Sequence, residues 1–299
     1  MHVMLVGLLL LLVVLAIPFI WKPEGRPPLN GPALDDLTYR EIAFESGELR
    51  MGGMLFLPDV PGPHPLTVLI HGSGPSSRDS AWYLSIADHL QRNGIAVLLP
   101  DKRGCEQSEG DWRTASLPEL AEDTVAAVAY GARLDDAAFS TIGVMGLSQG
   151  GWIAPVAATL NPEVDFVVSM SGAAVPTDEQ LLHEEIHSIE RMGTYHFVAR
   201  LLAPLSTARL RRMDFWAPLA GFDPLPYWRE VDVPVFLAFG GGDPSVPVAA
   251  SAERIESLDR DWLVEVYPDG GHGISDPVTQ RVQEAFLADL VDFIARAGS

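Results

Sequence analysis

The sequence contains one cysteine, Cys105, among its 299 residues. A single thiol cannot form an internal disulfide, and it also excludes a four-cysteine zinc site and a cysteine-ligated iron–sulfur cluster. Basic residues are scarce too, because 20 Lys and Arg stand against 40 Asp and Glu and give a net charge of −20. Such an acidic surface repels phosphate backbones, so we expect no nucleic-acid partner. Hydrophobic residues make up 47% of the chain, as in a protein with a sizeable core.

Residues 3–21 contain no charged side chain. A helix of this length covers roughly 28 Å, close to the hydrocarbon thickness of a bilayer. We therefore expect residues 1–21 to form a single-pass N-terminal transmembrane anchor. The alternative is a cleaved secretory signal and a secreted protein, although the segment lacks a basic start and a good cleavage site. A buried core helix is the third interpretation, and the side of the membrane that holds the main domain stays open.

Residues 22–36 are predicted to form a Pro-rich linker, because four prolines among residues 22–32 exclude a helix or a central strand. The globular domain is then expected over 37–299. Its first part, 37–57, alternates polar and apolar residues around Gly47 and predicts an antiparallel pair at a sheet edge.

Short apolar runs of the kind found in parallel strands buried on both faces follow. They are 66–70, 95–99, 141–145, 166–170, 235–239 and 263–267. Helical patterns lie between most of them, at 80–92, 117–132, 152–160, 251–258 and 279–294. Alternating strands and helices predict an α/β fold with a mostly parallel sheet and helices on both faces.

About sixty residues, 173–232, interrupt this alternation. A crossover needs only about a dozen residues plus connections, so the excess predicts an inserted helical lid. Helices are expected at 178–192 and 198–202. The aromatic side chains of 215–228 either line an apolar pocket or pack the lid onto the sheet.

The most specific motif is Gly146-Leu-Ser148-Gln-Gly150, between a predicted strand and a predicted helix. A sharp strand–turn–helix there exposes a serine hydroxyl at the carboxyl edge of the sheet, and glycines permit the tight turn. Ser148 is the predicted nucleophile, and it needs a base to accept its proton. His272, in a glycine-rich loop after the last strand, is the predicted general base.

The predicted base needs a carboxylate that fixes its tautomer. Asp243, which follows the strand at 235–239, is the predicted orienting acid; Asp223 and Asp269 are its rivals. For the oxyanion, the backbone N–H groups of Ser73 (or Gly74) and Gln149 are the predicted donors. His71 is expected to brace the Ser73 loop.

His183 and His187 have a spacing that could hold a metal. We expect a solvated helix face there instead, and no metal site.

The chain from residue 37 onward resembles an α/β-hydrolase of the serine-esterase type, related to dienelactone hydrolase-like and prolyl-oligopeptidase-like hydrolases. The matching segments, in the family's order, are 71–75, 101–104, 146–150, 243–247 and 271–273. The resemblance implies the eight-stranded fold, no cofactor, and ester or amide hydrolysis through an acyl-enzyme on Ser148. One departure is Glu106, where the family has a glycine. Members with an aspartate or cysteine nucleophile are disfavoured by Ser148.

The predicted function is thus a membrane-tethered serine hydrolase that cleaves a small-molecule carboxylic ester. A peptidase, amidase or acyltransferase with the same triad is the alternative, and Glu184 and Glu185 would suit a peptidase by binding a substrate amino group. A non-catalytic membrane-tethered binding scaffold is the third hypothesis. The sequence leaves the oligomeric state open.

Overall fold

A computed structural model describes residue 7 and residues 28–298. Its centre is an eight-stranded sheet with the order β1-β2-β4-β3-β5-β6-β7-β8. Only β1 and β2 run antiparallel to their neighbours, at one edge, and the other pairs are parallel. The strands are β1 Arg40–Ser46, β2 Leu49–Phe56, β3 His64–Ile70, β4 Ala96–Pro100, β5 Phe139–Leu147, β6 Phe166–Met170, β7 Val235–Gly240 and β8 Leu263–Tyr267. The predicted α/β sheet and its antiparallel edge are confirmed.

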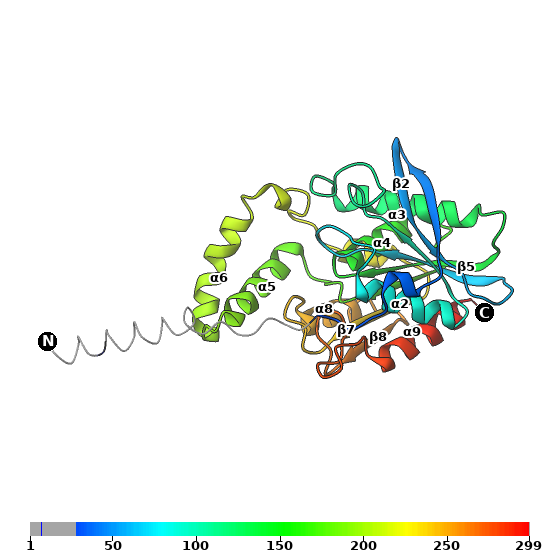
Figure 1. Ribbon diagram of the computed structural model, residues 1–299. Helices are drawn as coiled ribbons and strands as arrows, with labels where there is room; N and C mark the ends of the chain where they lie inside the picture. Colours follow the sequence, from blue (N-terminus) through cyan, green and yellow to red (C-terminus); the bar gives the residue numbers. More distant parts are fainter. Residues whose placement is uncertain (1–6, 8–27, 299) are drawn as a thin grey trace.

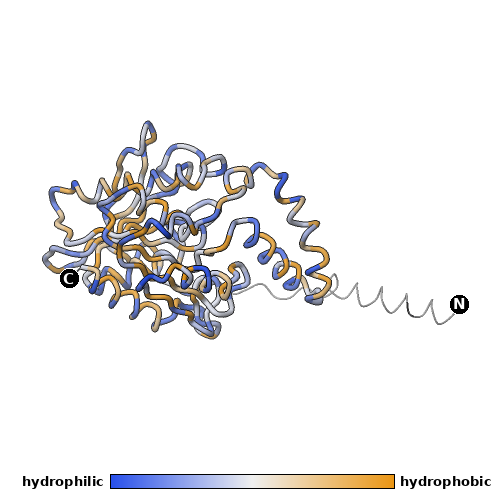
Figure 2. The backbone as a smooth tube through the Cα atoms, turned by 180° about the vertical axis from the view of Figure 1, so that it is seen from behind, coloured by the Kyte–Doolittle hydropathy of each residue, from blue (hydrophilic) through white to orange (hydrophobic). Residues whose placement is uncertain are grey.

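Helices cover both faces of the sheet, and Figure 1 shows the two layers. One core contains residues of α3 (Leu117–Ala132), α4 (Gln149–Leu160) and α8 (Val248–Glu256). The opposite core contains residues of α2 (Ala81–Arg92) and α9 (Glu284–Ala297). The central strands are buried on both faces because each apolar side chain meets one of these helical layers. The hydrophobic colouring of Figure 2 accordingly gathers in the interior.

Four helical elements lie between the neighbouring strands β6 and β7. They are α5 (Thr177–Arg191), α6 (His196–Leu210), the 3-10 turn η2 (Asp214–Trp216) and α7 (Leu225–Glu230). Figure 1 shows α5 and α6 side by side, projecting away from the sheet. We call residues 173–232 the lid.

Two helices differ most from their predicted bounds. The helix expected at 279–294 begins at Glu284, because the side chain of Asp276 accepts hydrogen bonds from the backbone N–H groups of Val278 and Thr279 and closes a turn there. The helix expected at 198–202 runs from His196 to Leu210 and continues through Pro204. Packing against α5 through buried Ala199 and Ala203 supports that longer helix.

The predicted anchor, 1–21, lies outside the described residues except for residue 7. Within the described part of the chain, no helix combines the length and the hydrophobicity needed to span a bilayer. The end of the predicted linker lies against the domain. The backbone N–H of Asn30 donates to the carbonyl of Gln280 at 2.6 Å, and Leu34 packs on the α2–α9 side of the sheet.

Candidate active site

Ser148 sits on the turn between β5 and α4, with φ 55° and ψ −117°. A positive φ is unfavourable for a residue with a Cβ, and such strain concentrates at functional turns. The flanking glycines are needed because the backbones approach closely. A Cβ on Gly146 would lie 2.0 Å from the carbonyl oxygen of Gly150, and one on Gly150 would lie 2.5 Å from that of Ile70. The motif therefore forms the strained turn that the sequence predicts.

Asp243 and His272, from loops after β7 and β8, are in direct contact. The Nδ1 of His272 lies 2.8 Å from Oδ2 of Asp243, whose side chain is fully buried. Its other oxygen, Oδ1, accepts hydrogen bonds from the backbone N–H groups of Ser245 (2.8 Å) and Val246 (3.2 Å). An ionised carboxylate only accepts, so Nδ1 carries the proton and Nε2 keeps a lone pair. This arrangement leaves Nε2 of His272 able to accept a proton.

Ser148 and His272 line the same pocket, which has a volume of about 800 Å³. Within the described residues no hydrogen bond joins the serine hydroxyl to the imidazole, so a proton transfer between them would require one or both side chains to move. Catalytic hydrogen bonds are often loose in a ligand-free site. We call this hollow the active-site pocket.

The rival carboxylates lie elsewhere. Asp223 forms an ion pair with Arg254 of α8 at 2.8 Å. Asp269 lines a separate pocket beside α2 and the start of α9. Of the three candidate aspartates, Asp243 is the one that lies within hydrogen-bond distance of the imidazole of His272.

The predicted oxyanion donors border the same pocket. Ser73 and Gln149 both line it. Gln149 is the first residue of α4, so its N–H has no partner inside the helix and lies at the positive end of the helix dipole. The neighbouring Gly72 N–H donates instead to the hydroxyl of Tyr83, at 2.7 Å. The donor assignment to Ser73 and Gln149 therefore remains a proposal that this placement supports.

Lys102, which the sequence analysis did not single out, connects the 72–74 loop to the side chain of Gln149. Its buried Nζ donates to the carbonyls of Gly72 (2.7 Å) and Gly74 (3.1 Å) and to Oε1 of Gln149 (2.9 Å). Burial lowers the pKa of Lys102 to about 8. The available signal was its position, since one of only two lysines in the chain lies two residues after β4 within a recognised motif.

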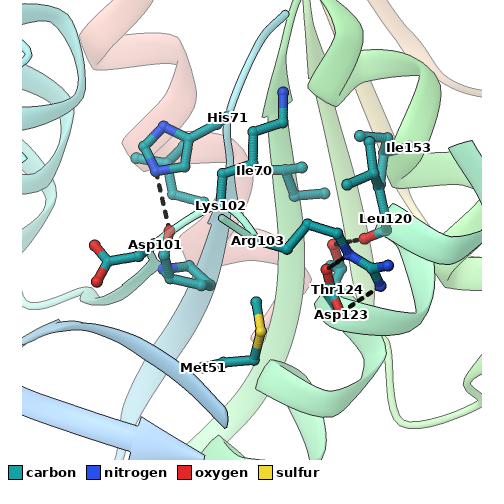
Figure 3. A pocket seen from close by; sticks show the side chains of 12 residues that line it. Met51, Ile70, His71, Asp101, Lys102, Arg103, Leu120, Asp123, Thr124 and Ile153 are labelled. Carbon is teal, nitrogen blue, oxygen red and sulfur yellow. Dashed lines mark hydrogen bonds and ion pairs between the residues drawn. The ribbon is translucent and has the colours of Figure 1, made fainter. Parts of the chain in front are cut away.

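His71 braces the loop from behind, where it lines a small cavity of about 40 Å³ (Figure 3). Its Nε2 lies 3.0 Å from the carbonyl oxygen of Pro100, and its ring meets Tyr83 edge-on at 4.5 Å. Burial, with the nearby Lys102 charge, lowers the pKa of His71 to about 3. The ring is therefore neutral at physiological pH and serves the structural role expected of it.

Glu106, the departure from the family pattern, adopts a backbone conformation that glycine favours. It has φ 50°, a conformation that glycine adopts without strain. Its carboxylate accepts a hydrogen bond from the backbone N–H of Arg78 at 3.3 Å. The loop thus keeps a positive φ at this position, with a side chain that makes its own contact.

The lid contributes a carboxylate and aromatic rings to the active-site pocket. Glu184 of α5 lines it, and burial raises the pKa of this carboxyl against the lowering effects of His272 and Ser245. Glu185 faces away and accepts a hydrogen bond from Ser206 of α6.

Some of the aromatic residues of 215–228 line the pocket, and others pack the lid onto the rest of the domain. Phe215 and Trp216 line the pocket, whereas Trp228 is buried against Trp262.

His183 and His187 stack with ring centroids 4.3 Å apart. In the described part of the chain, no group of three His, Cys, Asp or Glu side chains is placed to hold a metal ion.

Comparisons with known proteins place this chain in a family. A model described as the alpha/beta hydrolase family matches residues 67–288. The chain therefore belongs to the alpha/beta hydrolase family.

Its relatives include peptidases and esterases. Dipeptidyl aminopeptidase BIII of Pseudoxanthomonas mexicana is 27% identical over 297 residues, which cover 90% of this chain and 40% of that protein. Esterase EstD of Thermotoga maritima is 26% identical over 289 residues, covering 85% of this chain and 67% of that protein. The solved Pyrococcus furiosus esterase PF2001 is similar with a TM-score of 0.66 and 20% identity, over 91% of this chain and 99% of that one. This last likeness concerns the fold. The chain thus spans less than half the length of the peptidase relative.

Proposed function

We propose that the protein is a serine hydrolase that cleaves carboxylic esters through an acyl-enzyme on Ser148. The observation that carries the proposal is the meeting of a strained serine turn with an Asp243–His272 hydrogen bond at one pocket. Family membership supports the hydrolase class. The esterase relative supports the choice of esters.

In the proposed first step, Nε2 of His272 takes the hydroxyl proton as Oγ of Ser148 bonds to the ester carbonyl carbon. The carbonyl electron pair moves to oxygen, where the N–H groups of Ser73 and Gln149 stabilise it. Collapse of this intermediate breaks the bond to the alcohol, which leaves with the proton from Nε2. A water molecule repeats the sequence and releases the acid. Asp243 holds the imidazole in place and stabilises its protonated form.

Replacing the nucleophile tests this proposal. Ser148→Ala is expected to lower kcat for a p-nitrophenyl ester by about 10⁴-fold or more, because triad members act as a unit. A fluorophosphonate probe is expected to label the unmodified chain and not the variant. Ser140→Ala, at an exposed position on β5, is the matched control. A folded Ser148→Ala variant with most of its activity would contradict the mechanism, and an unlabelled wild-type chain would favour a binding scaffold.

A second candidate function is removal of residues from a free peptide amino terminus. The observation that favours it is Glu184, a partly buried carboxyl in the active-site pocket near His272. An ammonium group there would form a charge-assisted hydrogen bond. The peptidase relative supports this alternative.

Glu184→Gln distinguishes the two candidates. For an aminopeptidase, the change should lower kcat/KM for a dipeptidyl anilide with a free amino group by about 10- to 100-fold. The same substrate with an acetylated amine should be affected little. Equal effects on both anilides, with ester cleavage retained, would reject the aminopeptidase function and leave the esterase proposal intact.

We also propose that residues 1–21 anchor the chain to a membrane. The support is the 19-residue uncharged run at 3–21, followed by Lys22. Loss of membrane sedimentation on alkaline carbonate extraction would contradict an integral anchor.

A further inference from the structure

The lid helix α6 places its large apolar side chains in solvent. Phe197, Leu201 and Leu205, spaced by four residues, are 65%, 72% and 72% exposed. Residues at this spacing share one helix face. The buried face holds only small side chains, Ala199, Ala203 and Thr207. The hydrophobic pattern is therefore the reverse of that of an ordinary surface helix.

The apolar surface extends beyond this row, to both ends of the helix. The further exposed side chains are Met192, Tyr195, Leu202 and Met213. Large contiguous apolar surfaces of this kind mark interaction sites.

The same segment is the basic part of an acidic protein. Residues 191–213 contain no Asp or Glu, although the whole chain carries a net charge of −20. Arg200, Arg209 and Arg212 are exposed, and Arg211 pairs with Asp178 at 2.7 Å. The five arginines of the segment are Arg191, Arg200, Arg209, Arg211 and Arg212.

We infer that α6 is an interfacial helix that docks on a bilayer with anionic headgroups. Exposed large apolar residues together with arginines are the composition of helices that lie in the membrane interface. Arginines near an anionic leaflet add electrostatic attraction. A second copy of the chain is a poor occupant, because a twofold contact would bring these basic surfaces together.

The proposed anchor reinforces this assignment without being required for it. The described fold resumes at residue 28, seven residues after the apolar run ends at Trp21. Seven residues span at most about 25 Å. A bilayer that held the anchor would therefore lie within short reach of the domain.

Docking through α6 would bring the active-site pocket near the lipid. The helix packs on α5, which lines the pocket with Gln180, Leu181 and Glu184. The bilayer surface would then lie one helix layer away from the side chains that contact a substrate.

Depth-dependent quenching tests the docking surface in the full-length chain. Cys105, which is buried, is replaced by Ser in all variants. A bimane label is then attached to the new cysteine of a Leu201→Cys variant. The labelled protein is mixed with vesicles of phosphatidylcholine and phosphatidylglycerol that contain doxyl-labelled lipid as the quencher. The matched control carries the label after Val60→Cys, at an exposed loop position between β2 and β3. We expect quenching at position 201 to exceed that at position 60 by about threefold or more, since only α6 would enter the interface.

Charge removal checks the electrostatic part. The triple change Arg200→Gln, Arg209→Gln and Arg212→Gln concerns exposed side chains, so the fold is expected to persist. It should reduce quenching at position 201 by about twofold or more in the anionic vesicles, and high salt should act in the same direction. Equal quenching at positions 201 and 60 would overturn the inference. The inference would also be overturned if the bimane signal did not change with lipid and the unlabelled Leu201→Cys chains formed disulfide crosslinks with one another. That result would identify a second copy of the chain as the occupant.

Discussion

At the scale of single residues, Lys102 connects the two segments that supply the proposed oxyanion donors. Its Nζ holds the 72–74 loop and the side chain of Gln149 at once. Removing it would leave two buried carbonyl oxygens without this donor, which allows the loop to shift. In the proposed mechanism the lysine acts through the loop and is a positioning residue.

Lys102→Met is expected to lower kcat for ester cleavage by about 10²-fold, the scale of losing one oxyanion donor, and to change KM little. Lys102→Arg should recover part of the loss, since a guanidinium also donates to carbonyls. Steady-state kinetics beside a thermal melt separates this effect from unfolding. An unchanged kcat in the Met variant would show that the loop keeps its shape without the lysine.

Among single residues, the sequence predicted best those whose role follows from their place along the chain. Asp243 and His272 each follow a strand of the sheet, and parallel strands end at one edge, so their contact could be anticipated. The position of Lys102 in a motif did not reveal its contacts, because two of its partners are backbone carbonyls about thirty residues away in the chain. The positive φ of Glu106 could not be predicted either. The sequence shows only that Glu106 stands where the family has a glycine.

At the scale of elements, the β5–α4 turn is the most constrained part of the fold. The backbones at Gly146 and Gly150 leave no room for a Cβ. The contact partner is main chain, so no side-chain rotation relieves the clash.

Gly146→Ala is expected to destabilise the protein by about 3 kcal/mol or more and to abolish ester turnover, because the turn must distort. Gly94→Ala is the matched control, at a position with φ +80° and open space around the new Cβ. Its cost should be about 1–2 kcal/mol, that of a left-handed backbone alone. Urea unfolding of both variants measures the difference, and similar values would refute the close approach.

The length of α6 marks the limit of sequence reasoning at this scale. The sequence analysis predicted only 198–202 for this helix. In the structure the small residues face α5 and the helix continues to Leu210. Strands such as β6 and β7 were predicted closely because both of their faces are buried, so any apolar run fits.

At the scale of the whole molecule, buried His71 makes the free energy of unfolding depend on pH. Its pKa of about 3 in the folded chain lies below the ordinary 6.5. The unfolded chain therefore binds more protons between these values, and stability falls as the pH drops from about 6.5 toward 3. The loss is at most on the order of 4 kcal/mol.

His71→Gln should flatten this part of the stability profile, since an amide does not titrate and can still donate to the Pro100 carbonyl. Urea unfolding at a series of pH values measures the slope of each protein. Parallel profiles for the two proteins would show that other groups govern the acid sensitivity.

The lid leaves β6 at its carboxyl end and enters β7 at its amino end, because the two strands are parallel. Within the lid, residues 177 and 222 are neighbours, since the backbone N–H of Thr177 donates to the carbonyl of Phe222 at 2.9 Å. A segment whose ends are neighbours can be exchanged for a shorter or longer one without moving the sheet. The residues of the proposed active site and this segment of the lid can thus vary independently of each other. Grafting another family member's segment between residues 177 and 222 would offer a route to new substrate preferences while the strands stay in place.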